Sequence, residues 1–119
     1  MPHLTIEYSD NLHLFDTVTV LADLNAALMA TGYFYEADIK SRAIRLNEFL
    51  VGVSNDERAF VHARLAVMPR PVEVRRILSA TLLERLKQLY VCPENVHLQL
   101  SVEVVELDSD CYAKAVVEG

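Results

Sequence analysis

Residues 2–9 read PHLTIEYS, a run in which apolar and polar side chains alternate. A period of two is typical of a strand that buries one face. The turn-prone residues SDN follow at once and end the strand. The expected apolar face consists of Pro2, Leu4, Ile6 and Tyr8. The expected polar face consists of His3, Thr5, Glu7 and Ser9.

A helix is predicted next, in the run FDTVTVLADLNAALMATG. Asp16 is placed to cap its start, and Gly32 is placed to end it. The run DIKSRAIRL then alternates again and predicts a second strand, with Lys40, Arg42, Ile44 and Leu46 on one side. We expect the helix to pack through an apolar stripe of Leu14, Val18, Leu21, Ala22, Leu28 and Met29.

The second half of the chain repeats this order at a spacing of roughly sixty residues. AFVHARLAV predicts a strand, PVEVRRILSATLLERLKQLY an amphipathic helix with Pro71 at its first position, and NVHLQLSVEVVEL a final strand. The expected buried faces are Val61, Ala63, Leu65 and Val67, then Val74, Leu78, Leu82, Leu86 and Leu89, then Val96, Leu98, Leu100, Val102 and Val104.

The predicted fold class is α/β (α+β), with two βαβ units that form a four-stranded sheet and place both helices on one face. Parallel strands and a right-handed connection are expected in each unit. We expect one domain over residues 1–119, made of a βαβ unit (2–46), a loop (47–58), a second βαβ unit (59–107) and a C-terminal arm (108–119). The polar face of the sheet would either be solvated or meet other subunits.

The composition is that of a globular protein with an acidic balance. Hydrophobic residues make up 52% of the 119 residues, enough for a core, and the net charge is −6. An acidic chain is a poor partner for nucleic acid or an anionic membrane. No signal peptide and no apolar run of about 20 residues is visible, so we expect a cytoplasmic protein.

Metal and redox chemistry are not indicated. The histidines have no metal-ligand spacing, so neither a metal nor a cofactor is expected. Cys92 and Cys111 are expected to be reduced, and a redox role for either is a minor alternative. The four histidines are His3, His13, His62 and His97.

Pro2 has a property that no other residue of the chain offers. Removal of Met1 would turn its nitrogen into a terminal secondary amine. An apolar surround and nearby cations lower the pKa of such an amine, which suits a general base at neutral pH. The alternative is that Met-Pro is a common start and Pro2 an inert strand end.

Three cations are candidates for binding an anion. Lys40 and Arg42 share one side of a strand, and Arg70 lies in MPRP, immediately before the second helix. A residue before proline is biased toward extended geometry. Arginine beside a helix start can hold a carboxylate through two hydrogen bonds. The alternative for each is a solvated surface charge.

The ordered set PHLTIEYSDN, LNAALMATGYF, IKSRAIRL and AFVHARLAV, followed shortly by Arg70, resembles the 5-carboxymethyl-2-hydroxymuconate isomerase family. That family belongs to the tautomerase superfamily, with 4-oxalocrotonate tautomerase and macrophage migration inhibitory factor. The resemblance runs from Pro2 to about Glu106. It departs at Lys40, where the best-known relatives have Arg, and at Pro69, where a Gly is expected.

The resemblance implies a cofactor-independent isomerase that works as a homotrimer on a small carboxylated substrate from the breakdown of aromatic compounds. Pro2 would be the general base and acid. Lys40, Arg42 and Arg70 would bind carboxylates and stabilise developing negative charge. A non-catalytic trimeric module that binds an anionic metabolite or a protein partner is the alternative function.

Overall fold

The computed structural model describes residues 1–90, 92 and 95–119. Its element order matches the strand–helix–strand pattern predicted for each half. The elements are β1 (His3–Ser9), α1 (Thr17–Ala30), the short 3-10 helix η1 (Glu36–Asp38), β2 (Lys40–Leu46), β3 (Arg58–Val67), α2 (Val72–Leu89) and β4 (His97–Glu106).

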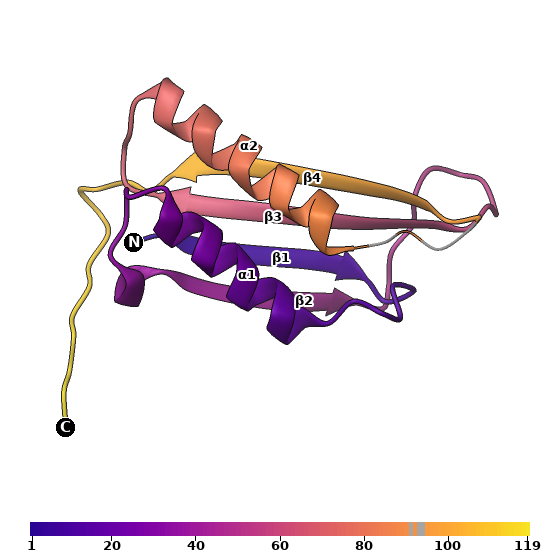
Figure 1. Cartoon of the computed structure of the whole chain (residues 1–119), viewed down its shortest axis with the longest axis horizontal. Coiled ribbons are helices and arrows are strands. Elements are labelled where there is room, and N and C mark those ends of the chain that lie inside the picture. The colour runs from indigo at the N-terminus through magenta and orange to yellow at the C-terminus, as the bar shows by residue number, and fades with distance from the viewer. Residues whose placement is uncertain (91, 93–94) are drawn as a thin grey trace.

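The four strands form one sheet in the order β2-β1-β3-β4. Strand β1 pairs with β2 in parallel, and β3 pairs with β4 in parallel, as predicted for the two βαβ units. The two units join through the antiparallel pair of β1 and β3. Both helices cover the same face of the sheet, which confirms the predicted layer arrangement (Figure 1).

The core lies between this face of the sheet and the two helices. The predicted inner face of β3 is confirmed, because Val61, Ala63, Leu65 and Val67 are fully buried. Full burial of one valine or leucine side chain contributes about 1.5–3 kcal/mol. The helices contribute Val20, Leu24 and Leu28 from α1, and Leu78, Leu82 and Leu86 from α2.

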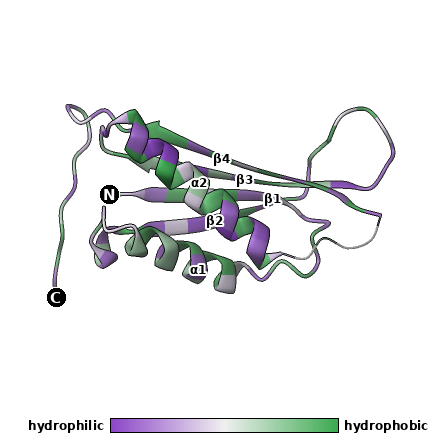
Figure 2. Cartoon of the chain, turned by 45° about the horizontal axis from the view of Figure 1, so that its top comes forward, coloured by the Kyte–Doolittle hydropathy of each residue, from purple (hydrophilic) through white to green (hydrophobic). Residues whose placement is uncertain are grey.

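The stripe predicted for the first helix is only partly confirmed, because Leu28 is buried and Leu21 packs against the core while the other four residues are exposed. Leu14 and Val18 are 83% and 78% exposed, and Met29 is 46% exposed. The sequence of α1 carries apolar residues on most of its sides, so the helical period alone does not select the buried side. Contact with the sheet selects it instead. Figure 2 shows hydrophobic and hydrophilic residues side by side along both helices.

The ends of the helices follow local chemistry. The side chain of Asp16 accepts a hydrogen bond from the backbone N–H of Thr19, as predicted for the cap of α1. Gly32 follows that helix with a φ of +81°, a conformation that favours glycine. Pro71 was predicted as the first helical residue of α2. It is instead the N-cap, because its ψ of 151° is extended.

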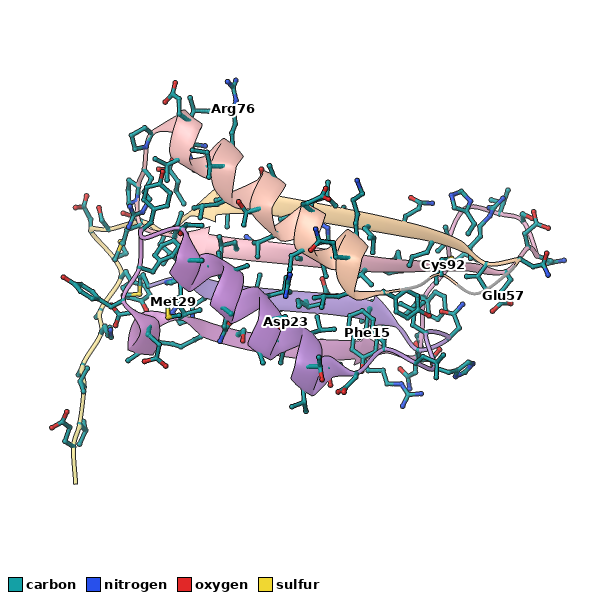
Figure 3. The ribbon with its side chains drawn as sticks, viewed as in Figure 1. Phe15, Asp23, Met29, Glu57, Arg76 and Cys92 are labelled. Atoms are coloured by element: carbon teal, nitrogen blue, oxygen red, sulfur yellow. The ribbon has the colours of Figure 1, made fainter. Side chains whose placement is uncertain are left out.

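Aromatic rings close the core at the end remote from the amino terminus. Phe15 stacks on Tyr8 with 4.8 Å between ring centroids and lies 5.9 Å from the ring of Tyr90. Figure 3 shows Phe15 at this end of the helical layer. Neither α1 nor α2 combines the length and the apolar character that crossing a membrane requires, over the residues described.

Candidate active site

The amino terminus lies at the end of the molecule where α2 begins and where η1 leads into β2 (Figure 1). The ring of Pro2 is fully buried, in line with the buried Leu4 and Ile6 of the same strand. Its carbonyl accepts a hydrogen bond of 3.1 Å from the backbone N–H of Lys40. Strand pairing therefore fixes the first residues of the chain beside the start of β2.

The pKa of the amino group at the chain end lies below that of an ordinary terminal amine. Burial lowers the pKa of the Met1 amino group, and Lys40, Lys114 and Arg70 lower it further, while Asp38 raises it. An oxygen of Asp38 lies 3.9 Å from this nitrogen, and the Met1 side chain is 13% exposed. Removal of Met1 would make the Pro2 nitrogen the terminal amine, and this nitrogen lies one residue, at most about 3.6 Å, from that of Met1.

Lys40 and Arg70 are held by backbone and aromatic groups around this nitrogen. The ammonium group of Lys40 donates to the carbonyl oxygen of Asp38. Arg70 Nη2 donates to the carbonyl of Tyr33 at 2.9 Å, and the guanidinium lies 5.0 Å from the centroid of the Phe34 ring. Cation–π contact and a hydrogen bond together restrict the orientation of this guanidinium.

Arg42 lies further along the sheet, on the face that the helices leave open. Its Nη2 contacts Nδ1 of His3 at 2.7 Å. Burial, Arg42 and Lys40 lower the pKa of His3, in that order. The structure thus places the positive charges of Lys40 and Arg70 near the amino terminus. It places Arg42 beside His3, which follows Pro2 in the sequence.

Two charged residues of this end were not predicted. Asp38 lies in η1, and Lys114 lies in the irregular segment that follows β4; Lys114 Nζ is 2.7 Å from Asp38 Oδ1. The carboxyl pKa of Asp38 is lowered by Lys114 and the amino terminus. An acid two residues before Lys40 was visible in the sequence. Lys114 belongs to no periodic pattern, so no sequence signal placed it here.

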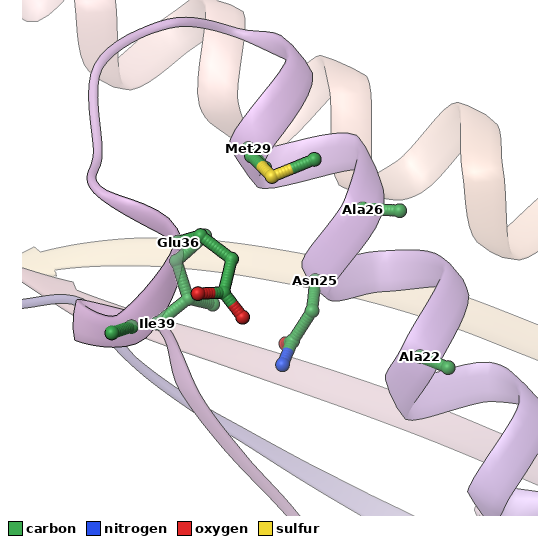
Figure 4. Close-up of a pocket in the computed structure, with 7 residues that line it drawn as sticks. Ala22, Asn25, Ala26, Met29, Glu36 and Ile39 are labelled. Carbon is green, nitrogen blue, oxygen red and sulfur yellow. The ribbon is translucent and has the colours of Figure 1, made fainter.

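A cavity of about 330 Å³ lies between α1 and η1 and does not include the predicted site residues. Figure 4 shows Asn25 and Glu36 directed toward this space from the two elements. The cavity is lined by Ala22, Asn25, Ala26, Met29, Glu36, Ala37 and Ile39. The predicted residues gather instead around the amino terminus.

This arrangement suits proton transfer on an anion. An amine whose pKa is lowered can be neutral near pH 7 and accept a proton. Cations beside it attract a carboxylate and stabilise negative charge that develops on an adjacent oxygen. No oxidation or reduction is needed for such a step.

Comparison with solved structures identifies the fold. The fold matches a fused 4-OT protein described as a symmetric trimer, with a TM-score of 0.69 at 11% identity, over 95% of this chain and 93% of that one. At this identity the match concerns the fold alone. It places the domain among the tautomerase folds.

The chain belongs to the 5-carboxymethyl-2-hydroxymuconate isomerase family, whose model matches residues 2–116. It is 33% identical to a 5-carboxymethyl-2-hydroxymuconate Delta-isomerase of Escherichia coli over 110 residues, which are 90% of this chain and 87% of that protein. It also resembles the crystal structure of a 5-carboxymethyl-2-hydroxymuconate isomerase from Deinococcus radiodurans. That match has a TM-score of 0.88 and 33% identity, over 96% of this chain and 88% of the other.

Proposed function

We propose that this chain is a cofactor-independent isomerase of a carboxylated 2-hydroxymuconate, of the 5-carboxymethyl-2-hydroxymuconate Delta-isomerase type, with Pro2 as the general base. The observation that carries the proposal is the Met1 amino group next to the buried Pro2, because burial and Lys40 lower the pKa of that amino group although Asp38 raises it. Membership of the isomerase family supports the reaction class. The relatives in Escherichia coli and Deinococcus radiodurans support the substrate class.

The proposed reaction moves one proton and changes no oxidation state overall. The neutral nitrogen of Pro2 removes the proton of the enol hydroxyl, so the O–H bond breaks and a dienolate forms. The protonated nitrogen then delivers the proton to carbon, where a C–H bond forms. Lys40, Arg42 and Arg70 bind the carboxylates and stabilise the dienolate oxygen.

The Pro2→Ala variant tests the role of the base. General acid–base catalysis contributes roughly 10²–10⁴-fold to a rate. We therefore expect kcat on 5-carboxymethyl-2-hydroxymuconate to fall by about two orders of magnitude or more, because the variant replaces the secondary amine with a primary one. Undiminished turnover in the Pro2→Ala variant contradicts the proposed mechanism.

Mass spectrometry of the amino terminus separates this proposal from the alternative of a binding module. We expect the natively expressed protein to lack Met1. Retention of Met1 would leave the nitrogen of Pro2 in a peptide bond, where it cannot accept a proton. That result favours a non-catalytic domain that binds an anionic metabolite or a protein partner.

We also propose that the enzyme is a homotrimer in which the helix-free face of the sheet meets other subunits. The support is the tautomerase fold and the polar side chains on that face, among them Thr5, Glu7 and His62. Light scattering on the purified protein is expected to give a mass three times that of the chain. We propose a cytoplasmic location, where the exposed Cys92 and Cys111 would remain reduced.

A further inference from the structure

The segment after β4 crosses the amino-terminal end of the molecule before it extends away from the sheet (Figure 1). Two of its side chains attach it there. Tyr112 Oη lies 2.8 Å from Nε2 of His3, and their rings meet edge to face with 5.9 Å between centroids. Lys114 Nζ lies 2.7 Å from Asp38 Oδ1. Residues far apart in sequence therefore meet beside Pro2.

The direction of the hydrogen bonds in this group follows from Arg42. A guanidinium donates hydrogen bonds and accepts none. Because Arg42 Nη2 lies 2.7 Å from His3 Nδ1, this ring nitrogen must be the acceptor. The ring of His3 then carries its proton on Nε2 and is neutral, which agrees with the lowered pKa of this histidine.

The protonated Nε2 of His3 must donate to the oxygen of Tyr112. The hydroxyl of Tyr112 keeps its own proton, and within residues 1–90, 92 and 95–119 no acceptor for that proton is found. Tyr112 is half-buried, so its ring is held while the hydroxyl can still reach a ligand. Such a hydroxyl is a positioned hydrogen-bond donor beside Arg42.

We propose that the C-terminal segment completes the active site, with Tyr112 donating its hydroxyl proton in a hydrogen bond to a carboxylate of the substrate that Arg42 also binds. Lys114 adds a fourth positive charge close to the amino terminus and holds the segment on Asp38. The ligand class is a compound with at least two carboxylates, of which one lies at Arg42 and Tyr112 and another lies toward Arg70. This inference rests on the proposed function for the location of the substrate.

Adipate, a saturated dicarboxylate that cannot be isomerised, is a probe for binding alone. Hydrogen bonds to charged groups contribute about 1.5–3 kcal/mol, so loss of one weakens binding by roughly tenfold or more. We expect Tyr112→Phe to raise the Kd for adipate by about tenfold in isothermal titration calorimetry. The phenyl ring loses the hydrogen bond with His3 but preserves the edge-to-face ring contact, so we expect the fold to be retained.

Tyr35→Phe is the matched control, because Tyr35 is 83% exposed and lies next to η1. We expect the control to bind adipate with the affinity of the unmodified protein. With 5-carboxymethyl-2-hydroxymuconate, Tyr112→Phe should raise KM by the same factor and change kcat little. A merely structural loss would instead lower the melting temperature and the fraction of active protein.

The two proposals fail in different ways. Equal affinity of Tyr112→Phe and Tyr35→Phe for adipate overturns the role of Tyr112, and so does an unmodified protein that binds no adipate. Binding that depends on Tyr112 in a protein that isomerises no muconate supports the role of Tyr112 and contradicts the proposed function. Full turnover by Pro2→Ala contradicts the base while leaving the adipate result intact.

Discussion

The carboxylate of Asp38 lies 3.9 Å from the amino nitrogen of Met1, at the end of the sheet where Lys40 also lies. This acid raises the pKa of the amine, whereas Lys40 and burial lower it. The protonation of the terminal nitrogen therefore depends on opposing charges from η1 and β2. After removal of Met1, we expect the same balance to act on Pro2.

Two substitutions at this end should shift the pH dependence of the reaction in opposite directions. The base works when neutral, so kcat/KM falls as the pH drops through its pKa. Asp38→Asn removes the group that raises the pKa, and the acidic limb should move to lower pH. Lys40→Met removes a group that lowers it, and the limb should move to higher pH.

Profiles of kcat/KM against pH for both variants test this expectation. Glu36→Gln, in the same short helix as Asp38, is the control and should leave the limb in place. A shift of both limbs in the same direction would show that charge is not what sets the protonation of the base.

Arg70 is expected to bind substrate through its restricted guanidinium. Arg70→Met should lower kcat/KM by roughly 10–100-fold, chiefly through KM, because a charged hydrogen-bond donor is lost. Arg76→Met is the control, since Arg76 is exposed and points away from the sheet at the start of α2 (Figure 3). Steady-state kinetics of the two variants measure the difference, and equal effects would argue against a binding role.

The buried side of α1 can be verified by a pair of truncations on one helix. Leu24 is fully buried, so Leu24→Ala should lower the free energy of unfolding by about 2–5 kcal/mol. Val18 is 78% exposed, so Val18→Ala should change it by about 0.5 kcal/mol or less. Urea unfolding measures both, and a larger loss at Val18 would contradict the observed orientation of the helix.

The cap of α1 should make stability depend on pH. Hydrogen bonds from Thr19 lower the carboxyl pKa of Asp16 below its ordinary value of 3.8. A lowered pKa means that the stabilisation is present above the pKa of the unfolded chain and is lost as the pH falls through the folded value. Asp16→Ala should therefore lower the melting temperature at pH 7 and have less effect at about pH 3.

Asp16→Asn separates the cap from the charge, because asparagine retains a side-chain acceptor. We expect its melting temperature to lie closer to that of the unmodified protein, with a weaker dependence on pH. Thermal unfolding followed by circular dichroism gives both quantities. Identical behaviour of the alanine and asparagine variants would count against a capping role.

The order of the elements and their layering could be predicted because most of the elements have one dominant period. The inner face of β3 and the Leu78, Leu82 and Leu86 stripe of α2 each combine a clear period with polar residues on the other side. The orientation of α1 could not be predicted, since Leu14 and Val18 are as apolar as the buried Leu24. Only the position of the sheet distinguishes them.

Part of the candidate site could also be predicted from the sequence. The pairing of the first two strands follows from the fold, and it fixes the positions of Pro2, Lys40 and Arg42. Arg70 could be placed because it directly precedes a helix. Tyr112 and Lys114 reach the site from a segment without regular structure. Their contacts depend on the path of the backbone, which no periodicity encodes.

The side chain of Met1 is only 13% exposed, and the residue after it is buried and hydrogen-bonded to β2. An aminopeptidase needs an extended chain end, which this folded terminus does not offer. Excision of the initiator is therefore expected on the nascent chain, before the first strand pairs. Because the proposed base is the free nitrogen of Pro2, we expect a purification tag fused ahead of Pro2 to abolish activity, so recombinant material should carry its tag elsewhere or be cleaved to leave proline first.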